Sequence, residues 1–213
     1  MNSIERLTKL FAEFPGIGPK QAKRFVYFLI TRSGGYIEEL KKEIKELRDE
    51  IEMCADCKRY FVLPTQSGKN GNEIIKTCNI CSDTSRDQSV LMVVGRDIDF
   101  ENIEKSHSFN GKYFILGGLV PILDKNPEMR IRLTELYNLI EKIGKTGGLK
   151  EIILALDANS EGEYTGELIK SHLLPLVSKY NIKISEFGRG LSTGTELEYS
   201  DAETIKSALQ NRH

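Results

Sequence analysis

Apolar residues recur at helical spacing along residues 1–52. The first stripe consists of Ile4, Leu7, Phe11 and Phe14. After a break at Pro15–Pro19, the segment Lys20–Ile30 has the pattern of a second helix. In Ile37–Glu52 the apolar residues again stand three or four positions apart: Leu40, Ile44, Leu47 and Ile51. We therefore expect two short helices joined by a tight turn, followed by an amphipathic connector helix with a charged, solvated face.

The period changes in residues 83–188, where short apolar or β-rich runs alternate with helical patterns. The four runs are Val90–Val94, Tyr113–Leu116, Ile152–Leu156 and Ile182–Ser185, and the helical patterns are Pro127–Ile143 and Gly166–Tyr180. This alternation predicts parallel strands joined by crossover helices, as in an α/β domain. In such a sheet, functional groups gather at the carboxyl ends of the strands.

Overall composition gives little direct information about partners. The chain has 213 residues and a formal net charge of −1, but residues 1–32 carry six basic and only two acidic side chains. The first residues lack the apolar segment of a signal peptide, and the longest apolar runs fall far short of the ~20 residues that span a bilayer. We therefore expect a cytoplasmic protein without membrane attachment.

The four cysteines of the chain form two C-x-x-C pairs, Cys54 with Cys57 and Cys78 with Cys81, separated by twenty residues. Each pair can direct two thiolates at one metal, so the spacing predicts a four-cysteine zinc site. Four sulfur ligands leave no open position, which makes the zinc structural rather than catalytic. The alternative is two disulfides or four unrelated thiols. A reducing cytosol favours the metal.

The break at Pro15–Pro19 contains Gly16 and Gly18, which permit a tight turn and a close approach of the backbone to a ligand. The helix that follows presents free N–H groups and the positive end of its dipole, which suit a phosphate. Lys20 and Arg24 stand four apart on that helix and could hold neighbouring phosphates. This pattern resembles the helix-hairpin-helix motif and implies sequence-independent DNA binding. An ordinary helical hairpin with surface cations is the alternative.

Three carboxylates, Asp157, Glu161 and Glu163, follow the third apolar run, where a strand is expected to end. They could bind a hard cation such as Mg²⁺. They could equally belong to a helix start, with Asn159 or Ser160 as the N-cap and the two glutamates complementing the dipole. The residues alone do not decide between these two interpretations.

The order of these features resembles the RecR family of bacterial recombination mediators along nearly the whole chain. The matching motifs are Phe14–Lys20, the paired cysteines, Leu116-Gly117-Gly118 with Leu123-Asp124, Glu161-Gly162-Glu163, and the closing segment from Arg189-Gly190 to Asp201. The α/β part looks like a Toprim domain. The resemblance implies a non-enzymatic role in DNA repair. With RecO, and with RecF in some bacteria, such proteins help RecA replace single-strand-binding protein at gaps, and they form dimers or ring-like tetramers around DNA.

One departure bears on catalysis. Catalytic Toprim domains have a glutamate at the end of their first strand, whereas this chain has Gly95 there. Asp97 could substitute for it, or Arg96 could neutralise Asp97. Because glycine cannot transfer a proton, we expect no strand cleavage or primer synthesis. The alternative function is a metal-dependent Toprim enzyme that acts on nucleic-acid phosphodiesters.

We therefore expect a multidomain α/β (α+β) protein in four parts. They are a helix-hairpin-helix module with its connector helix (1–52), a four-cysteine zinc finger (53–82), a Toprim-like parallel-sheet domain (83–188) and a short C-terminal oligomerisation segment (189–213). In the last part, Tyr199–Asp201 is expected to cap a final helix that contains Ile205 and Leu209. This segment packs either on its own domain or, as the resemblance suggests, on a neighbouring subunit.

Overall fold

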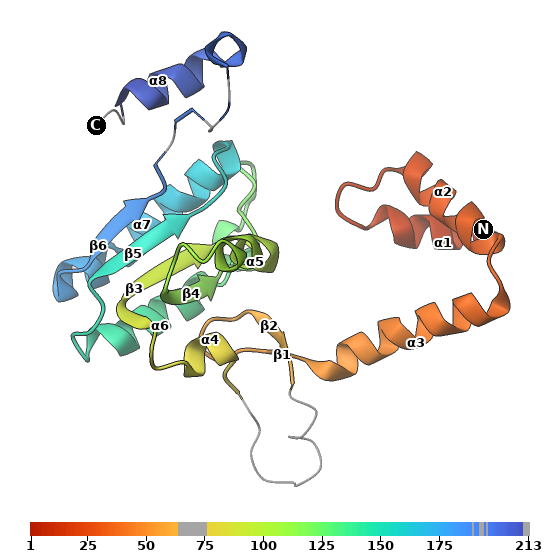
Figure 1. The fold of residues 1–213 in the computed structure, drawn as a ribbon, viewed down its shortest axis with the longest axis horizontal. Coiled ribbons are helices and arrows are strands. Elements are labelled where there is room, and N and C mark those ends of the chain that lie inside the picture. The colour runs from red at the N-terminus through yellow and green to blue at the C-terminus, as the bar shows by residue number, and fades with distance from the viewer. Residues whose placement is uncertain (64–75, 189, 192–193, 195, 211–213) are drawn as a thin grey trace, which may run out of the picture. The chain divides into compact units, whose positions relative to one another are not determined.

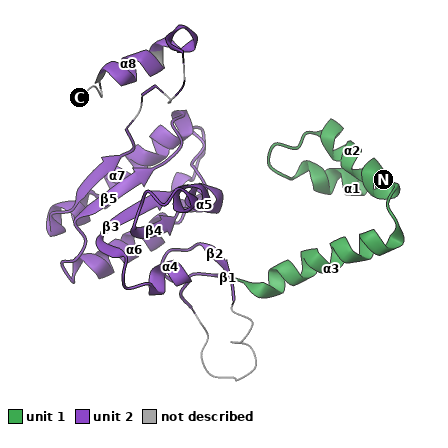
Figure 2. Cartoon of the chain, in the orientation of Figure 1, with its two compact units in different colours: residues 1–51 green, residues 52–213 purple. Residues whose placement is uncertain are grey.

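The structure is a computed structural model that describes residues 1–63, 76–188, 190–191, 194 and 196–210. The chain forms two compact units, Met1–Ile51 and Glu52–His213 (Figure 2). The four-part division expected from the sequence stays a prediction.

The first unit contains the three expected helices: α1 (Ser3–Ala12), α2 (Pro19–Ile30) and α3 (Gly34–Glu50). A capping box between Asn2 and Glu5 starts α1. Pro19 occupies the first helical position of α2, where its missing N–H costs nothing. The Ser33 side chain accepts a hydrogen bond from the Tyr36 amide, so α3 begins three residues earlier than the apolar pattern indicated.

The first unit buries little of its apolar surface. Ala22 and Val26 of α2 are buried, whereas α3, which is described throughout, buries none of its residues. Ile44 and Leu47 from the expected stripe of α3 are more than half exposed. The apolar face of this helix is therefore uncovered within its own unit.

The second unit is built on a four-stranded parallel sheet, which confirms the expected α/β class (Figure 1). Its strands are β3 (Asp87–Val94), β4 (Gly111–Ile115), β5 (Glu151–Ala155) and β6 (Lys183–Glu186), in the order β4-β3-β5-β6. Val94 pairs with both Ile115 and Ala155, so the carboxyl ends of the three strands are level. The segments that follow these strands start at the same edge of the sheet.

Two apolar clusters cover the two faces of this sheet. On one face, residues such as Leu91 and Phe114 pack with α6 (Leu133–Gly144) and α7 (Ser160–Tyr180). On the other face, Met92 and Tyr113 pack with Phe100 of α5 (Asp97–Lys105) and with the cysteines. This alternation along the strands is the period-two pattern of a sheet that is buried on both sides.

The two expected crossover helices have different bounds in the structure. The pattern Pro127–Ile143 contains a 3-10 helix at Pro127–Met129 and, separately, α6. The Arg132 amide between them donates to the Leu116 carbonyl, which draws this stretch back to the sheet and interrupts the helix. Helix α7 begins at Ser160 rather than at Gly166, because Asn159 caps it.

Short elements flank the sheet. The cysteine segment contributes β1 (Ile51–Met53), β2 (Tyr60–Val62) and the one-turn helix α4 (Asn79–Ser82). The C-terminal part contains a 3-10 helix at Leu197–Tyr199 and α8 (Ala202–Gln210). Asp201 accepts a hydrogen bond from the Thr204 amide, so the expected cap of the last helix is confirmed. Arg189, from the closing motif, lies outside the described residues.

None of the helices in the described part of the chain is long and apolar enough to cross a membrane.

Candidate functional site

The four cysteines converge on one point. Their sulfur atoms all lie within 4.8 Å of one another, and the Sγ atoms of Cys57 and Cys78 are 3.5 Å apart. A tetrahedral shell with metal–sulfur bonds of ~2.3 Å places its sulfurs about 3.8 Å apart, which matches this spacing. All four cysteines are free of disulfides, and three of them are buried. In this structure the four thiols are neither joined as disulfides nor scattered, and the cluster fits a single metal ion.

The protonation chemistry of the cluster also favours a cation. In the thiol form, hydrogen bonding to Cys57 lowers the pKa of Cys54, whereas hydrogen bonding to Cys54 raises the pKa of Cys57. The thiols thus share protons, because four thiolates in so small a space would repel one another. The Cys78 amide donates to the sulfur of Cys54 at 3.3 Å, which stabilises negative charge on that atom. A divalent ion would allow all four sulfurs to be ionised together.

The first cysteine pair is fastened to the free edge of the sheet. Strand β4 is an edge strand, and its Ile115 amide donates to the Cys57 carbonyl at 2.8 Å. Arg132, which precedes α6, donates from Nη1 to the carbonyls of Lys58 and Ile115, both at 3.1 Å. An unpaired strand edge is a template for wrong pairing, so the cysteine segment shields part of β4.

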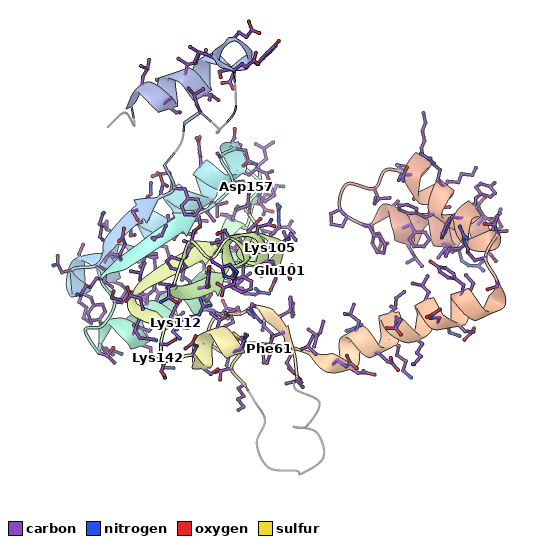
Figure 3. All side chains as sticks on the ribbon, in the orientation of Figure 1. Phe61, Glu101, Lys105, Lys112, Lys142 and Asp157 are labelled. Carbon is purple, nitrogen blue, oxygen red and sulfur yellow. The ribbon has the colours of Figure 1, made fainter. Side chains whose placement is uncertain are left out.

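The second cysteine pair is held by a lysine of the same strand. Nζ of Lys112 donates to the carbonyls of Ile80, Cys81 and Asp83 at 2.9, 3.0 and 2.7 Å (Lys112 is labelled in Figure 3). These carbonyls belong to the last turn of α4 and the residue after it, where a short helix leaves its acceptors unpaired. One ammonium group therefore satisfies the end of the turn that carries Cys78 and Cys81.

The hairpin of the first unit has the geometry of an open backbone turn. Gly16 has a φ of 74°, in the left-handed region that favours glycine, and the Ile17 amide donates to the Phe14 carbonyl at 3.0 Å. Gly18 is the N-cap of α2 and has no side chain to bond the first amides of the helix. A Cβ added at Gly16 or Gly18 would meet no atom within 4 Å. Space for a ligand is therefore present beside the start of α2.

Lys20 and Arg24 are both exposed on α2, one turn apart. Arg24 makes one long hydrogen bond of 3.4 Å to the neighbouring Gln21 side chain. Phe11 packs edge-on against Phe14 and Phe25, which holds α1 and α2 together beneath the turn. The structure thus places the predicted residues Gly16 and Gly18 in the turn before α2, and Lys20 and Arg24 on the first half of that helix.

The acidic segment after β5 is a helix start rather than a gathered cluster. Asn159 accepts a hydrogen bond from the Gly162 amide at 2.8 Å, which confirms it as the N-cap of α7. Glu161 and Glu163 are exposed in the first turn, where they complement the helix dipole. Residues two apart on a helix point to different faces, so these carboxylates do not converge. Within the described residues, the four cysteines are the group of possible ligands close enough to share a metal.

Gly162, between these glutamates, is required by packing. A Cβ on Gly162 would lie 2.0 Å from the Asp157 carbonyl oxygen, so any side chain there would displace the turn. The motif Glu161-Gly162-Glu163 therefore combines a structural glycine with two solvent-facing charges.

The carboxylates around Gly95 are individually satisfied. Asp97 accepts a hydrogen bond from the Tyr60 amide at 2.9 Å, and Asp99 accepts one from the Arg96 amide at 2.8 Å. Nη1 of Arg96 lies 3.9 Å from Oδ2 of Asp157, so Arg96 forms an exposed ion pair with one carboxylate of the acidic segment. The sequence left two roles open for Asp97, as a substitute for the missing glutamate or as a partner of Arg96; in the structure Arg96 contacts Asp157 and Asp97 accepts from the Tyr60 amide. Gly95 itself has no side chain to transfer a proton, and a Cβ added there would lie 3.3 Å from Oδ2 of Asp99 and 3.3 Å from the Leu119 side chain.

Two residues of these sites were missing from the sequence analysis: Lys112 and Arg132, which bind backbone carbonyls that are distant in sequence. The partner of Arg96 was also missing, because Arg96 reaches the Asp157 carboxylate in the segment that follows β5. The position of Lys112 in an otherwise apolar strand is the one available signal, because a charge there needs buried partners.

Comparisons with known proteins agree with this architecture. Residues 89–187 match the family model of the Toprim domain, and residues 190–213 match the model described as RecR, C-terminal. The chain is 33% identical over 212 residues to Recombination protein RecR of Rhizobium leguminosarum bv. trifolii, covering 98% of this chain and 94% of the relative. It is 35% identical over 214 residues to the protein of the same name from Bifidobacterium adolescentis, covering 99% and 95%. The corresponding protein of Chloroherpeton thalassium is 31% identical over 211 residues, covering 99% and 96%.

Proposed function

The chain belongs to the RecR family of recombination proteins, and from this premise we propose that it is a DNA-binding mediator of recombinational repair. In this role it acts with RecO, and with RecF where that protein is present, to help load RecA on single-stranded gaps. The observation that carries the proposal is the match to named recombination proteins over nearly the full chain, including both the Toprim and the C-terminal parts.

The hairpin at the start of α2 is the proposed DNA contact. Its uncapped amides, the open space beside Gly16 and Gly18 and the exposed cations Lys20 and Arg24 together suit two or more adjacent phosphates. Contacts of this kind hold the DNA backbone and do not read bases, so the binding is independent of sequence.

The uncovered apolar surface of the first unit supports a homo-oligomer. Tyr27, Phe28 and Ile30 of α2 are 44 to 60% exposed. These side chains and the exposed Ile44 and Leu47 of α3 are apolar groups that a second copy could bury. A dimer or a tetrameric ring would place several hairpins around one DNA molecule.

The metal of the cysteine cluster is proposed to be a structural zinc. Four thiolates in a closed tetrahedral shell are a zinc set and leave no position for substrate. Zinc would supply folding free energy to the cysteine segment, and the chain's own contribution is to hold the turns against β4.

The alternative, a metal-dependent Toprim enzyme, has less support from the site. Gly95 provides no group to transfer a proton, and the carboxylates nearby are bonded to amides or paired with Arg96. We therefore propose a binding role for the acidic segment, with Asp157, Glu161 and Glu163 facing the RecO partner.

Charge reversal on the hairpin tests the proposal. The double variant Lys20→Glu with Arg24→Glu should weaken binding to unrelated DNA sequences to a similar extent. It should also reduce the salt dependence, because each lost phosphate contact removes roughly 0.9 from the slope of log K against log salt. The measurement is fluorescence anisotropy with labelled single-stranded, duplex and gapped DNA at several salt concentrations.

The matched control is Lys41→Glu with Lys45→Glu, which makes the same charge change one turn apart on α3. If the hairpin variant and this control bind DNA alike at every salt concentration, the hairpin has only a structural role. Cleavage of the DNA by the parent protein in Mg²⁺ or Mn²⁺ would instead favour the enzymatic alternative.

A further inference from the structure

Among the described residues of the second unit, the segment between β4 and α6 carries the most exposed apolar side chains. Leu123 is 93% exposed and Met129 is 85% exposed, and Ile122 beside them is half exposed. Single exposed apolar residues are common on protein surfaces, but three on one ten-residue loop are an unusual concentration. We call residues 121–130 the apolar loop.

The apolar loop is held in one shape by its own hydrogen bonds. Asp124 accepts from the Asn126 amide at 2.8 Å and from Nε of Arg130 at 2.5 Å, and its own amide donates to the Pro121 carbonyl. The side chain of Asp124 is only 10% exposed, although it is the most polar part of the loop. The Asn126 amide and the Arg130 guanidinium hold the pKa of Asp124 below its ordinary value. The Asp124 carboxylate therefore faces inward and is bonded within the loop, while the apolar side chains of Leu123 and Met129 face solvent.

A buried threonine connects this loop to the acidic segment. Thr165 of α7 is fully buried, and its hydroxyl accepts a hydrogen bond from the Val120 amide at 2.9 Å. The same hydroxyl donates to the Glu161 carbonyl at 2.7 Å. One side chain thus joins the residue that precedes the apolar loop to the first turn that carries Glu161 and Glu163. The two features leave the same edge of the sheet as neighbours.

We propose that the apolar loop and the acidic first turn of α7 form one docking surface for a partner protein with an apolar groove bordered by basic residues. The apolar side chains are the anchors and the carboxylates are the polar rim, which is the usual anatomy of a protein interface. Because the loop is already fixed, binding costs little ordering entropy. The nearby carboxylates favour a basic protein partner and disfavour DNA, whose phosphates they would repel.

This inference rests on the proposed function, in which RecO is the partner of the acidic segment, and it adds the apolar anchor to that site. The test compares three double variants with the parent: Leu123→Ser with Met129→Ser, Glu161→Gln with Glu163→Gln, and a control, Ile98→Ser with Leu174→Ser. The control residues are 56 and 61% exposed and lie on α5 and α7. Affinity for purified RecO is measured by surface plasmon resonance at low and high salt.

The apolar variant should lose roughly tenfold or more in affinity at both salt concentrations, as expected for the loss of two central anchors. The glutamine variant should lose affinity mainly at low salt, because charge effects are screened. The control should bind like the parent. Since the mutated side chains are exposed, thermal unfolding and DNA binding should be unchanged in all three.

Parent-like RecO binding by the apolar variant would overturn the inference and leave the proposed function intact. Failure of the parent itself to bind RecO would overturn the proposed partnership and this surface with it. A smaller molecular mass of the apolar variant in light scattering would assign the loop to contacts between copies of the chain, and a loss of DNA affinity would assign it to DNA. Either result would also overturn the inference.

Discussion

The cysteine cluster, which lies beside the edge strand β4, and the acidic segment, which follows β5, arrange their possible metal ligands in opposite ways. Lys112, which holds the second cysteine pair, and Asp157 of the acidic segment are both labelled in Figure 3. In the cysteine cluster, two turns face each other and bring four buried or partly buried sulfurs within 4.8 Å. In the acidic segment, the glutamates diverge from one helical turn and remain exposed.

This difference shows that ligand type and spacing along the chain do not suffice to make a metal site. To bring four ligands to one metal, two segments must face each other. Contacts with the rest of the protein must also hold these segments in place against the repulsion between the ligand charges. The cysteine segment has such contacts in the hydrogen bonds that Lys112 and Arg132 donate to its carbonyls. The acidic segment has instead a capping asparagine and a neighbouring guanidinium, which satisfy its groups singly.

Removal of one cysteine should have the largest effect on metal binding, because it removes one of the four ligands. Cys57→Ser or Cys78→Ser is expected to abolish the one zinc per chain that we propose. Folding of the segment should fail with it, since structural zinc contributes roughly 10–16 kcal/mol in zinc-finger peptides. Elemental analysis of freshly purified, reduced protein measures the metal, and circular dichroism with limited proteolysis measures the folding.

Ala55→Ser is the control, because it places a hydroxyl beside two ligands and leaves all four thiols. It should retain the metal. Freshly reduced parent protein without stoichiometric zinc would contradict the assignment of the metal.

Replacement of Lys112 should have an intermediate effect on metal retention. Lys112 is not a ligand but holds the turn that carries Cys78 and Cys81, so this variant separates support of the ligands from the ligands themselves. Lys112→Met keeps the length of the side chain and leaves three carbonyls without their donor. Groups that position ligands typically change metal affinity by about 10- to 100-fold, so faster zinc loss to a chromogenic chelator is expected. Lys112→Arg should restore part of the retention.

Lys142→Met is the matched control for Lys112→Met. Lys142 is exposed and makes only a 3.7 Å ion pair with Asp56 in the first cysteine pair, so zinc retention should be close to that of the parent. Equal rates of zinc loss for Lys112→Met and Lys142→Met would show that the metal site does not depend on β4.

The sequence predicted the parts of this protein that depend on local patterns. The parallel sheet followed from the apolar runs, and the cysteine cluster from the two C-x-x-C pairs, because both patterns constrain residues only a few positions apart. The start of α7 and the cap at Asn159 were only partly predicted. The first turn of α7 is polar, so the apolar pattern became recognisable only at Gly166. The helix itself begins at Ser160, where Asn159 caps it.

Contacts between distant segments were not predictable in the same way. The pairing of Arg96 with Asp157 depends on the order of the strands, since β3 and β5 are neighbours although sixty residues of the sequence stand between the two side chains. Lys112 likewise finds its acceptors only after the cysteine segment folds back on β4. The predicted roles of Gly16, Gly18, Lys20 and Arg24 remain predictions, since DNA binding is a property of a complex.

Removal of Arg96 should have the smallest effect on metal binding. It tests directly whether the acidic segment could hold a metal as the cysteine cluster does. Arg96→Gln frees the Asp157 carboxylate from its only nearby guanidinium contact described here, at 3.9 Å between exposed groups. An exposed ion pair contributes roughly 0.2–1 kcal/mol, so Mn²⁺ affinity should rise by no more than about fivefold. The reason is that Glu161 and Glu163 still point away from each other.

Electron paramagnetic resonance of free Mn²⁺ measures the binding, and Lys170→Gln, which removes a cation 2.9 Å from Glu186, is the control. One tight Mn²⁺ per chain in Arg96→Gln, absent in the control, would show that the acidic segment is a latent metal site that one arginine blocks.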